Sequence, residues 1–217
     1  MEKVFTATGV VREAYDIVRN NFWKIIGQCF LLNLVFMLLS AFSGKNFLLG
    51  ILISALFAWS LIAFGLAYVE KKSFALEDIT NGLSFKKFLY FFCAYILFAL
   101  AVIGGFILLI IPGFIVLVQL ALVKYVAVRS DLAPLETLRE STRLTKGYRW
   151  EIFGFLMLMV LINILGALCL LVGLLFTIPL TLIATTLVYV KLAERGETEG
   201  DSEVIIEAEI IEVIETE

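Results

Sequence analysis

Histidine is absent from this chain of 217 residues, and cysteine occurs only three times, at well-separated positions. Without histidine, the chain lacks the side chain that most often serves as a general base near neutral pH. Cys29, Cys93 and Cys169 have no paired spacing, so we interpret them as buried thiols rather than metal or redox ligands. A glycine-rich phosphate loop is missing too. These absences predict no cofactor, no metal and no catalytic site, and therefore a protein that is not an enzyme.

Charged residues are also scarce, at 17% of the chain against about 25% in soluble domains. Four stretches contain none: residues 25–44, 46–69, 88–123 and 152–190, which hold 20, 24, 36 and 39 residues. A bilayer core about 30 Å thick takes about 20 helical residues per crossing. The first two stretches therefore fit one crossing each, and the last two fit an outward and a return crossing. Their continuously apolar pattern favours helices over a barrel.

We therefore predict an all-α polytopic membrane protein whose six transmembrane helices form three hairpins. The predicted spans are 23–42, 47–69, 87–110, 113–130, 150–171 and 174–193. An amphipathic interfacial helix precedes each hairpin, at about 8–21, 74–84 and 132–146. In the first, the apolar stripe consists of Val10, Val11, Ala14, Ile17 and Val18; in the third, it consists of Leu132, Leu135 and Leu138. Such stripes are expected to face the acyl chains.

The basic residues are distributed unevenly between the two predicted membrane faces. Sixteen of the 17 fall in or beside the N-terminal segment, the two long connections or the end of the last span, and only Lys45 falls on the other side. Because basic loops stay inside, both termini and both long connections are predicted to be cytoplasmic. Residues 1–195 then form the membrane domain, and residues 196–217 form a cytoplasmic tail with nine of the 20 acidic residues and no basic residue.

Two patterns divide the chain further. Ile111-Pro112-Gly113 predicts a reversal within the third stretch, and Gly173, with Pro179 beyond it, predicts one within the fourth. At an offset of 127 residues, Arg12-Glu13 matches Arg139-Glu140 and Trp23 matches Trp150. With a fainter middle copy, these matches indicate an internal repeat of three parallel units; chance alignment of apolar sequence is the alternative.

Polar residues inside the spans are few. Asn33, Gln119 and Asn163 each come from a different predicted unit, so a polar pocket between the hairpins is one hypothesis. Partners for interhelical hydrogen bonds are the more ordinary interpretation. The tail alternates isoleucine or valine with glutamate, which is open to three interpretations: an edge strand on a partner, an acidic amphipathic helix or a disordered segment.

The half of the chain from the third to the sixth span resembles a known group of prokaryotic membrane proteins. Its motifs are Ile111-Pro112-Gly113 and the run Leu138-Arg139-Glu140-Ser141-Thr142-Arg143-Leu144-Thr145-Lys146-Gly147. The group includes the membrane domain attached to some glycerophosphoryl diester phosphodiesterases and related six-helix integral membrane families. The resemblance implies the architecture, a prokaryotic cytoplasmic membrane and a structural role for Pro112, Gly113, Arg139, Glu140, Arg143, Lys146 and Gly147. It implies no hydrolysis, because that active site belongs to a separate soluble domain.

The leading hypothesis is a scaffold, accessory or lipid-interacting module of the cytoplasmic membrane. The alternative is a transporter of small solutes or lipids that uses the polar pocket. We expect membrane lipid as one partner and no nucleic acid; the sequence leaves open a protein partner at the acidic tail and a homo-oligomer.

The predicted orientation can be tested by cysteine labelling in intact cells. Cysteines introduced near Thr80 or Arg143 are expected to resist a thiol reagent that cannot cross the bilayer, and to react after the cells are permeabilised, because both positions lie in basic connections. Labelling of either position in intact cells would show that the topology is wrong.

Overall fold

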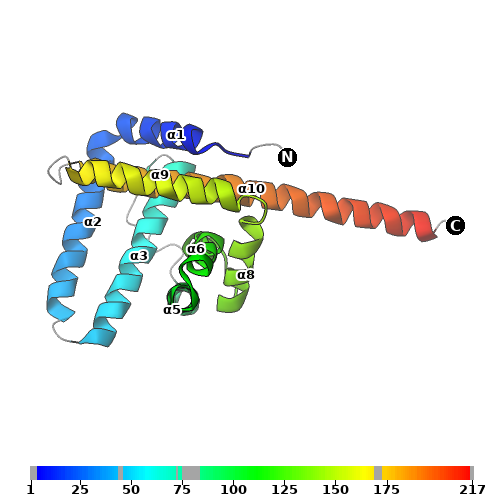
Figure 1. The fold of residues 1–217 in the computed structure, drawn as a ribbon, viewed down its shortest axis with the longest axis horizontal. Coiled ribbons are helices and arrows are strands. Elements are labelled where there is room, and N and C mark those ends of the chain that lie inside the picture. Colours follow the sequence, from blue (N-terminus) through cyan, green and yellow to red (C-terminus); the bar gives the residue numbers. More distant parts are fainter. Residues whose placement is uncertain (1–3, 44–45, 72, 75–83, 169–172, 216–217) are drawn as a thin grey trace.

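The computed structural model describes residues 4–43, 46–71, 73–74, 84–168 and 173–215. Within these ranges every regular element is an α-helix, which confirms the predicted all-α class. Figure 1 shows the arrangement of the helices. They are α1 (Ala7–Asn20), α2 (Phe22–Ser43), α3 (Phe47–Glu70), α5 (Phe85–Leu108), α6 (Ile110–Gln119), α7 (Val123–Arg129), α8 (Pro134–Leu144), α9 (Arg149–Leu168) and α10 (Leu174–Glu215).

Six stretches are apolar and long enough to cross a membrane, by length and composition. They are Phe22–Ala41, Leu48–Glu70, Phe85–Ile107, Pro112–Arg129, Arg149–Leu168 and Leu174–Gly196, close to the six predicted spans. Many of their large apolar side chains face outward, including Phe30, Met37 and Leu38 on α2. Soluble monomers rarely expose contiguous apolar surface of this kind. The structure is thus compatible with a multi-pass membrane protein.

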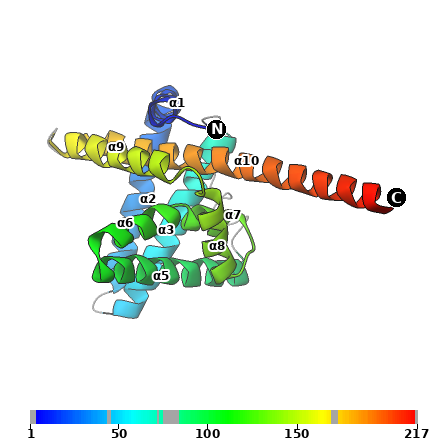
Figure 2. The same ribbon diagram turned by 45° about the vertical axis from the view of Figure 1, so that its right-hand side comes forward.

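The apolar helices do not share one direction. In Figure 1, α2 and α3 run upright while α9 and α10 run across the view, and Figure 2 shows the same steep crossing after a turn of 45°. Membrane helices tilt by about 0–40° from the bilayer normal, so spans of one bilayer lie closer to a common axis than these. Helix α2 packs on α3, α5 on α6 and α9 on α10, but the expected alignment of three parallel hairpins is not observed.

The reversal in the third apolar stretch lies before the proline. Helix α5 ends at Leu108 and α6 begins at Ile110, with Leu109 extended between them. Pro112 therefore lies in the first turn of α6, where a missing N–H leaves no intrahelical bond unmade. A Cβ on Gly105 would lie 3.0 Å from the Cα of Gly113. The role of Gly113 is thus to let the two helices approach each other. The third predicted span ends at 110 and the fourth begins at 113, whereas α5 ends at 108 and α6 begins at 110.

The fourth predicted span, 113–130, is not a single helix. Helix α6 ends at Gln119, and residues 120–122 form a turn before α7 begins. The N–H of Val123 donates to the carbonyl of Leu120 rather than to that of Gln119. The backbone carbonyl of Gln119 is therefore left for another donor, which has consequences described below.

Two glycines bring α9 and α10 into close contact. A Cβ on Gly173 would lie 2.7 Å from the Cα of Gly166, and a Cβ on Gly166 would lie 2.7 Å from Oγ1 of Thr177. Gly173 stands directly before α10, and Pro179 lies inside α10, both as predicted. Residues 169–172 lie outside the described residues.

The buried faces of the short helices differ from the predicted apolar stripes. On α1, Val10, Ala14 and Val18 are buried, and the helix packs on α9 and α10, so protein covers the face that we expected to meet acyl chains. On α8 the buried residues are Thr137, Ser141 and Leu144, whereas Leu135 is 63% exposed. Hydrogen bonding by Ser141 and apolar contact of Leu144 with the core together fix this face of α8. The predicted interfacial helix at 74–84 falls largely on residues 75–83, outside the described part.

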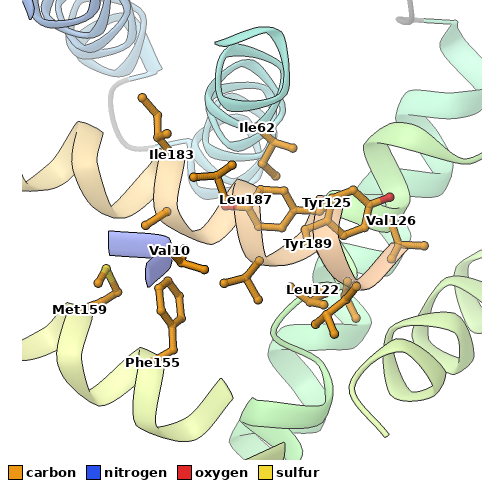
Figure 3. Close-up of a cluster of buried hydrophobic side chains, with 14 of the residues drawn as sticks. Val10, Ile62, Leu122, Tyr125, Val126, Phe155, Met159, Ile183, Leu187 and Tyr189 are labelled. Atoms are coloured by element: carbon orange, nitrogen blue, oxygen red, sulfur yellow. The ribbon is translucent and has the colours of Figure 1, made fainter. Parts of the chain in front are cut away.

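The buried core is organised around α10. Its residues Ile183, Leu187 and Tyr189 lie between side chains of four other helices, as Figure 3 shows. The surrounding residues are Val10 of α1, Ile62 of α3, Tyr125 and Val126 of α7, and Phe155 and Met159 of α9. The rings of Tyr125 and Tyr189 stack with centroids 5.5 Å apart. Helix α10 continues past this core through the acidic segment to Glu215, so the structure shows the tail as a helix.

The close contact of α9 and α10 predicts the effect of a small substitution. Gly173→Ala should lower the free energy of unfolding by about 1–3 kcal/mol, because the added methyl group meets the backbone of Gly166. The measurement is the thermal unfolding midpoint of the purified protein in detergent. Gly154→Ala on α9 is the matched control, since a Cβ there meets nothing within 4 Å; equal midpoints for the two variants would contradict the contact.

Candidate functional site

The three residues of the hypothetical polar pocket have separate surroundings. Asn33 is exposed on α2, and its Nδ2 donates to the carbonyl of Cys29 in the same helix at 2.8 Å. Asn163 on α9 donates through Nδ2 to Oγ1 of Thr181 on α10 at 2.7 Å. Gln119 lies at the end of α6, where its main chain contacts α8. The structure does not bring the three side chains together, and Asn163 alone behaves as an interhelical partner.

The polar contact that the structure shows in this half of the chain joins the backbone of α6 to side chains of α8 and its C-cap. Oγ of Ser141 donates to the carbonyl of Gln119 at 3.0 Å, and Oγ1 of Thr145 donates to the same oxygen at 3.3 Å. Both hydroxyl residues are fully buried. A buried carbonyl without a donor costs about 1–3 kcal/mol. The two hydroxyl groups therefore compensate for the break between α6 and α7.

The remaining motif residues shape and charge the end of α8. The guanidinium of Arg143 donates to both carboxylate oxygens of Glu140, at 2.7 and 2.8 Å. Arg139 and Lys146 are exposed. Gly147 has a φ of +89°, a left-handed conformation that favours glycine. This conformation lets the chain turn from α8 into α9 within four residues.

A polar groove lies between α1, α3 and α10. It has a volume of about 470 Å³, and its polar lining consists of Glu13, Asp16, Asn20, Asn21, Tyr68, Lys191 and Glu194. Nζ of Lys191 and a carboxylate oxygen of Glu13 are 2.5 Å apart. That pairing leaves Asp16 and Glu194 as the excess charge, so the groove is acidic. We call it the α1–α10 groove.

Further polar contacts join the same helix ends. Tyr68 donates its hydroxyl to Oε1 of Gln28 at 2.6 Å, and Nε2 of Gln28 donates to the carbonyl of Phe74. Arg129 at the end of α7 pairs with Glu70 at the end of α3. The distribution of basic residues predicts that these positions share one face of the membrane.

Lys124 on α7 is a cation near the apolar region, and aromatic rings lie beside it. Its Nζ lies 5.2 Å from the ring centroid of Tyr95 and 5.3 Å from that of Phe98, both on α5. Ammonium groups at this distance from aromatic faces gain cation–π attraction.

Among the described residues, no three histidine, cysteine, aspartate or glutamate side chains gather in a way that could hold a metal ion.

Sequence reasoning missed the roles of Ser141, Thr145, Glu13 and Lys191. The spacing of Thr137, Ser141 and Leu144 places them on one helical face, which is the signal that a buried polar stripe leaves in a sequence. No local signal links Glu13 with Lys191, because 178 residues separate them.

Comparison of the chain with protein-family models, with curated proteins and with solved structures found no match. The site is therefore interpreted from its own geometry.

The hydroxyl contacts of α8 predict a loss of stability. The double substitution Ser141→Ala and Thr145→Val should lower the free energy of unfolding by about 1–3 kcal/mol, because the part-buried carbonyl of Gln119 loses both side-chain donors. Thr142→Val is the control, since that hydroxyl donates only within α8, to Leu138. Denaturant titration in detergent measures both; a double variant as stable as the control would refute the role of the contact.

Proposed function

We propose that this chain is a non-enzymatic scaffold or accessory protein of the prokaryotic cytoplasmic membrane, with both termini in the cytoplasm. The observation that carries the proposal is the length of α10. Its 42 residues extend for about 63 Å, roughly twice the thickness of the hydrocarbon core. In Figure 1 its C-terminal part projects beyond the other helices. One helix thus links the buried core to an acidic segment whose backbone projects beyond the other helices.

The chemistry of that segment points to a protein partner with basic residues. Residues 196–217 carry nine acidic residues and no basic one. The acidic α1–α10 groove lies where α10 leaves the helical body, with Glu194 in its lining. Opposite charge on a partner would steer its approach. Because α10 is also part of the buried core, a partner bound to the tail would be fixed to the membrane domain.

The proposal includes three hairpins, each preceded by an interfacial helix, as the arrangement in the bilayer. The three ion pairs between separate segments support a common cytoplasmic side, since they join ends that the basic residues place there. They are Glu13–Lys191, Glu70–Arg129 and Lys87–Asp131. The proposed relation to the membrane domain of glycerophosphoryl diester phosphodiesterases concerns this architecture alone.

A catalytic role is not part of the proposal. The buried hydroxyl groups of Ser141, Thr145 and Thr186 donate to main-chain carbonyls, and the chain has no histidine to activate them. The transporter alternative is not carried forward, because Asn33, Gln119 and Asn163 have separate contacts in this structure.

The proposal predicts that capture of partners from native membranes depends on the tail. The full chain should retain a defined set of proteins that a chain ending at Arg195 loses, because the truncation removes the acidic segment. Quantitative mass spectrometry of the captured material at low and high salt is the measurement. Charged contacts at an exposed helix weaken with salt, so retention should fall as salt rises.

Two further variants define the outcome. Replacing Glu207, Glu209, Glu212 and Glu215 together by glutamine should reduce retention about as much as the truncation does. Asp131→Asn removes an exposed acidic residue outside the tail and should leave retention unchanged. If the truncated and full-length chains retain the same proteins, the tail is not the partner surface.

A further inference from the structure

A continuous apolar groove follows α9 along α6. Its first part has a volume of about 470 Å³ and is lined by Phe114, Ile115 and Val118 of α6 with Arg149, Trp150 and Phe153 of α9. Its second part, of about 550 Å³, shares Phe114 and Phe153 and continues along α9 past Asn163 to Ala167. We call the two parts the α6–α9 groove. Figure 2 shows α9 lying above α6.

This groove is long enough to hold a whole lipid chain. From Arg149 to Ala167 the helix rises about 27 Å, whereas the hydrocarbon of one leaflet is about 15 Å thick. Phe114 and Phe153 line both parts, with ring centroids 6.1 Å apart and planes at 90°. The ring of Trp150 meets that of Phe153 edge-on, with centroids again 6.1 Å apart. An extended acyl chain therefore has apolar contacts along its whole length.

The charge at one end of the groove distinguishes it from ordinary lipid-facing surface. Of the described residues that line either part, Arg149 is the only charged one, and it is exposed. None of the ion pairs between described residues involves it. A guanidinium binds the oxygens of a phosphate in a two-pronged geometry. Trp150, 83% exposed beside it, is the type of residue that lies at the headgroup level.

We propose that the α6–α9 groove binds one acyl chain of an anionic phospholipid, whose phosphate is held by Arg149. This inference rests on the membrane insertion in the proposed function, but not on the tail or its partner. An anionic headgroup is favoured over a zwitterionic one because Arg149 adds positive charge at the mouth and the lining of the groove contains no other charge.

The test is photochemical crosslinking of the full-length chain in vesicles. The vesicles consist of phosphatidylcholine with a minor fraction of phosphatidylglycerol, and in separate samples one of the two lipids carries a photoreactive group on its acyl chain. Mass spectrometry locates the crosslinks. We expect the phosphatidylglycerol probe to label peptides of α6 and α9 preferentially, and the phosphatidylcholine probe to label apolar helices without this preference.

Three variants separate a site from general lipid contact. Arg149→Gln should lower phosphatidylglycerol labelling of α6 and α9 about tenfold, the factor that corresponds to about 1.4 kcal/mol of lost binding free energy. Ile115→Trp should lower it by a similar factor, because position 115 is half-exposed and a larger ring there fills the groove. Lys24→Gln is the matched control: it removes a basic residue next to Trp23, which is as exposed as Trp150.

The outcomes are distinct. The proposal is overturned if Arg149→Gln labels like the original chain, if the two lipid probes label α6 and α9 equally, or if labelling is as strong on α2 as on the groove. A chain ending at Arg195 should keep the full labelling. Equal partner capture by the truncated and the full-length chain, with intact labelling, would therefore disprove only the scaffold role of the tail. Absence of labelling in every variant and at every helix would disprove membrane insertion itself, and the lipid site with it.

Discussion

The structure depends on the burial of the middle of α10 between helices from the first and the second half of the chain. Ile183 and Ala184 are fully buried, and α10 packs on α1, α2, α3, α8 and α9. In lipid, helices gain little from the hydrophobic effect, so close packing and interhelical hydrogen bonds must hold them together. The small residues at these contacts follow from this need: Gly65 lies against Thr186, and Gly166 lies against Gly173. Because several helices pack on α10, the C-terminal part of α10 projects from a well-packed helix.

A shortage of water around the helix ends explains why hydroxyl residues of α8 face the protein interior. A helix that ends inside an apolar region leaves carbonyl groups that no solvent can satisfy. The turn at residues 120–122 creates such a carbonyl at Gln119, and Ser141 and Thr145 supply the donors. The polar face of α8 therefore supplies the hydrogen bonds that the break between α6 and α7 removes. Substituting Ser141 and Thr145 without restoring a continuous helix would leave the carbonyl of Gln119 without these donors.

The sequence predicts what depends on local composition and fails where distant contacts decide. The six apolar stretches and the start of α10 after Gly173 follow from runs of residues that are adjacent in the chain. The break at residues 120–122 lies within an uninterrupted apolar run, so only the donors on α8 reveal why it is tolerated. The apolar stripe of α1 could be recognised, but not that α9 and α10 cover it rather than acyl chains. The ion pair of Glu13 with Lys191 joins two ends of the chain that no local pattern connects.

The first and third units of the proposed repeat show how similar sequences acquire different surroundings. Trp23 and Trp150 are both 83% exposed, as their matching positions would suggest. The acidic residues beside the two matched arginines diverge: Glu13 pairs across to α10, whereas Glu140 pairs with Arg143 within α8. Only the later tryptophan has a second helix, α6, beside it to complete a groove. The residues of α6 beside Trp150 thus distinguish the candidate lipid site from the matching position at Trp23.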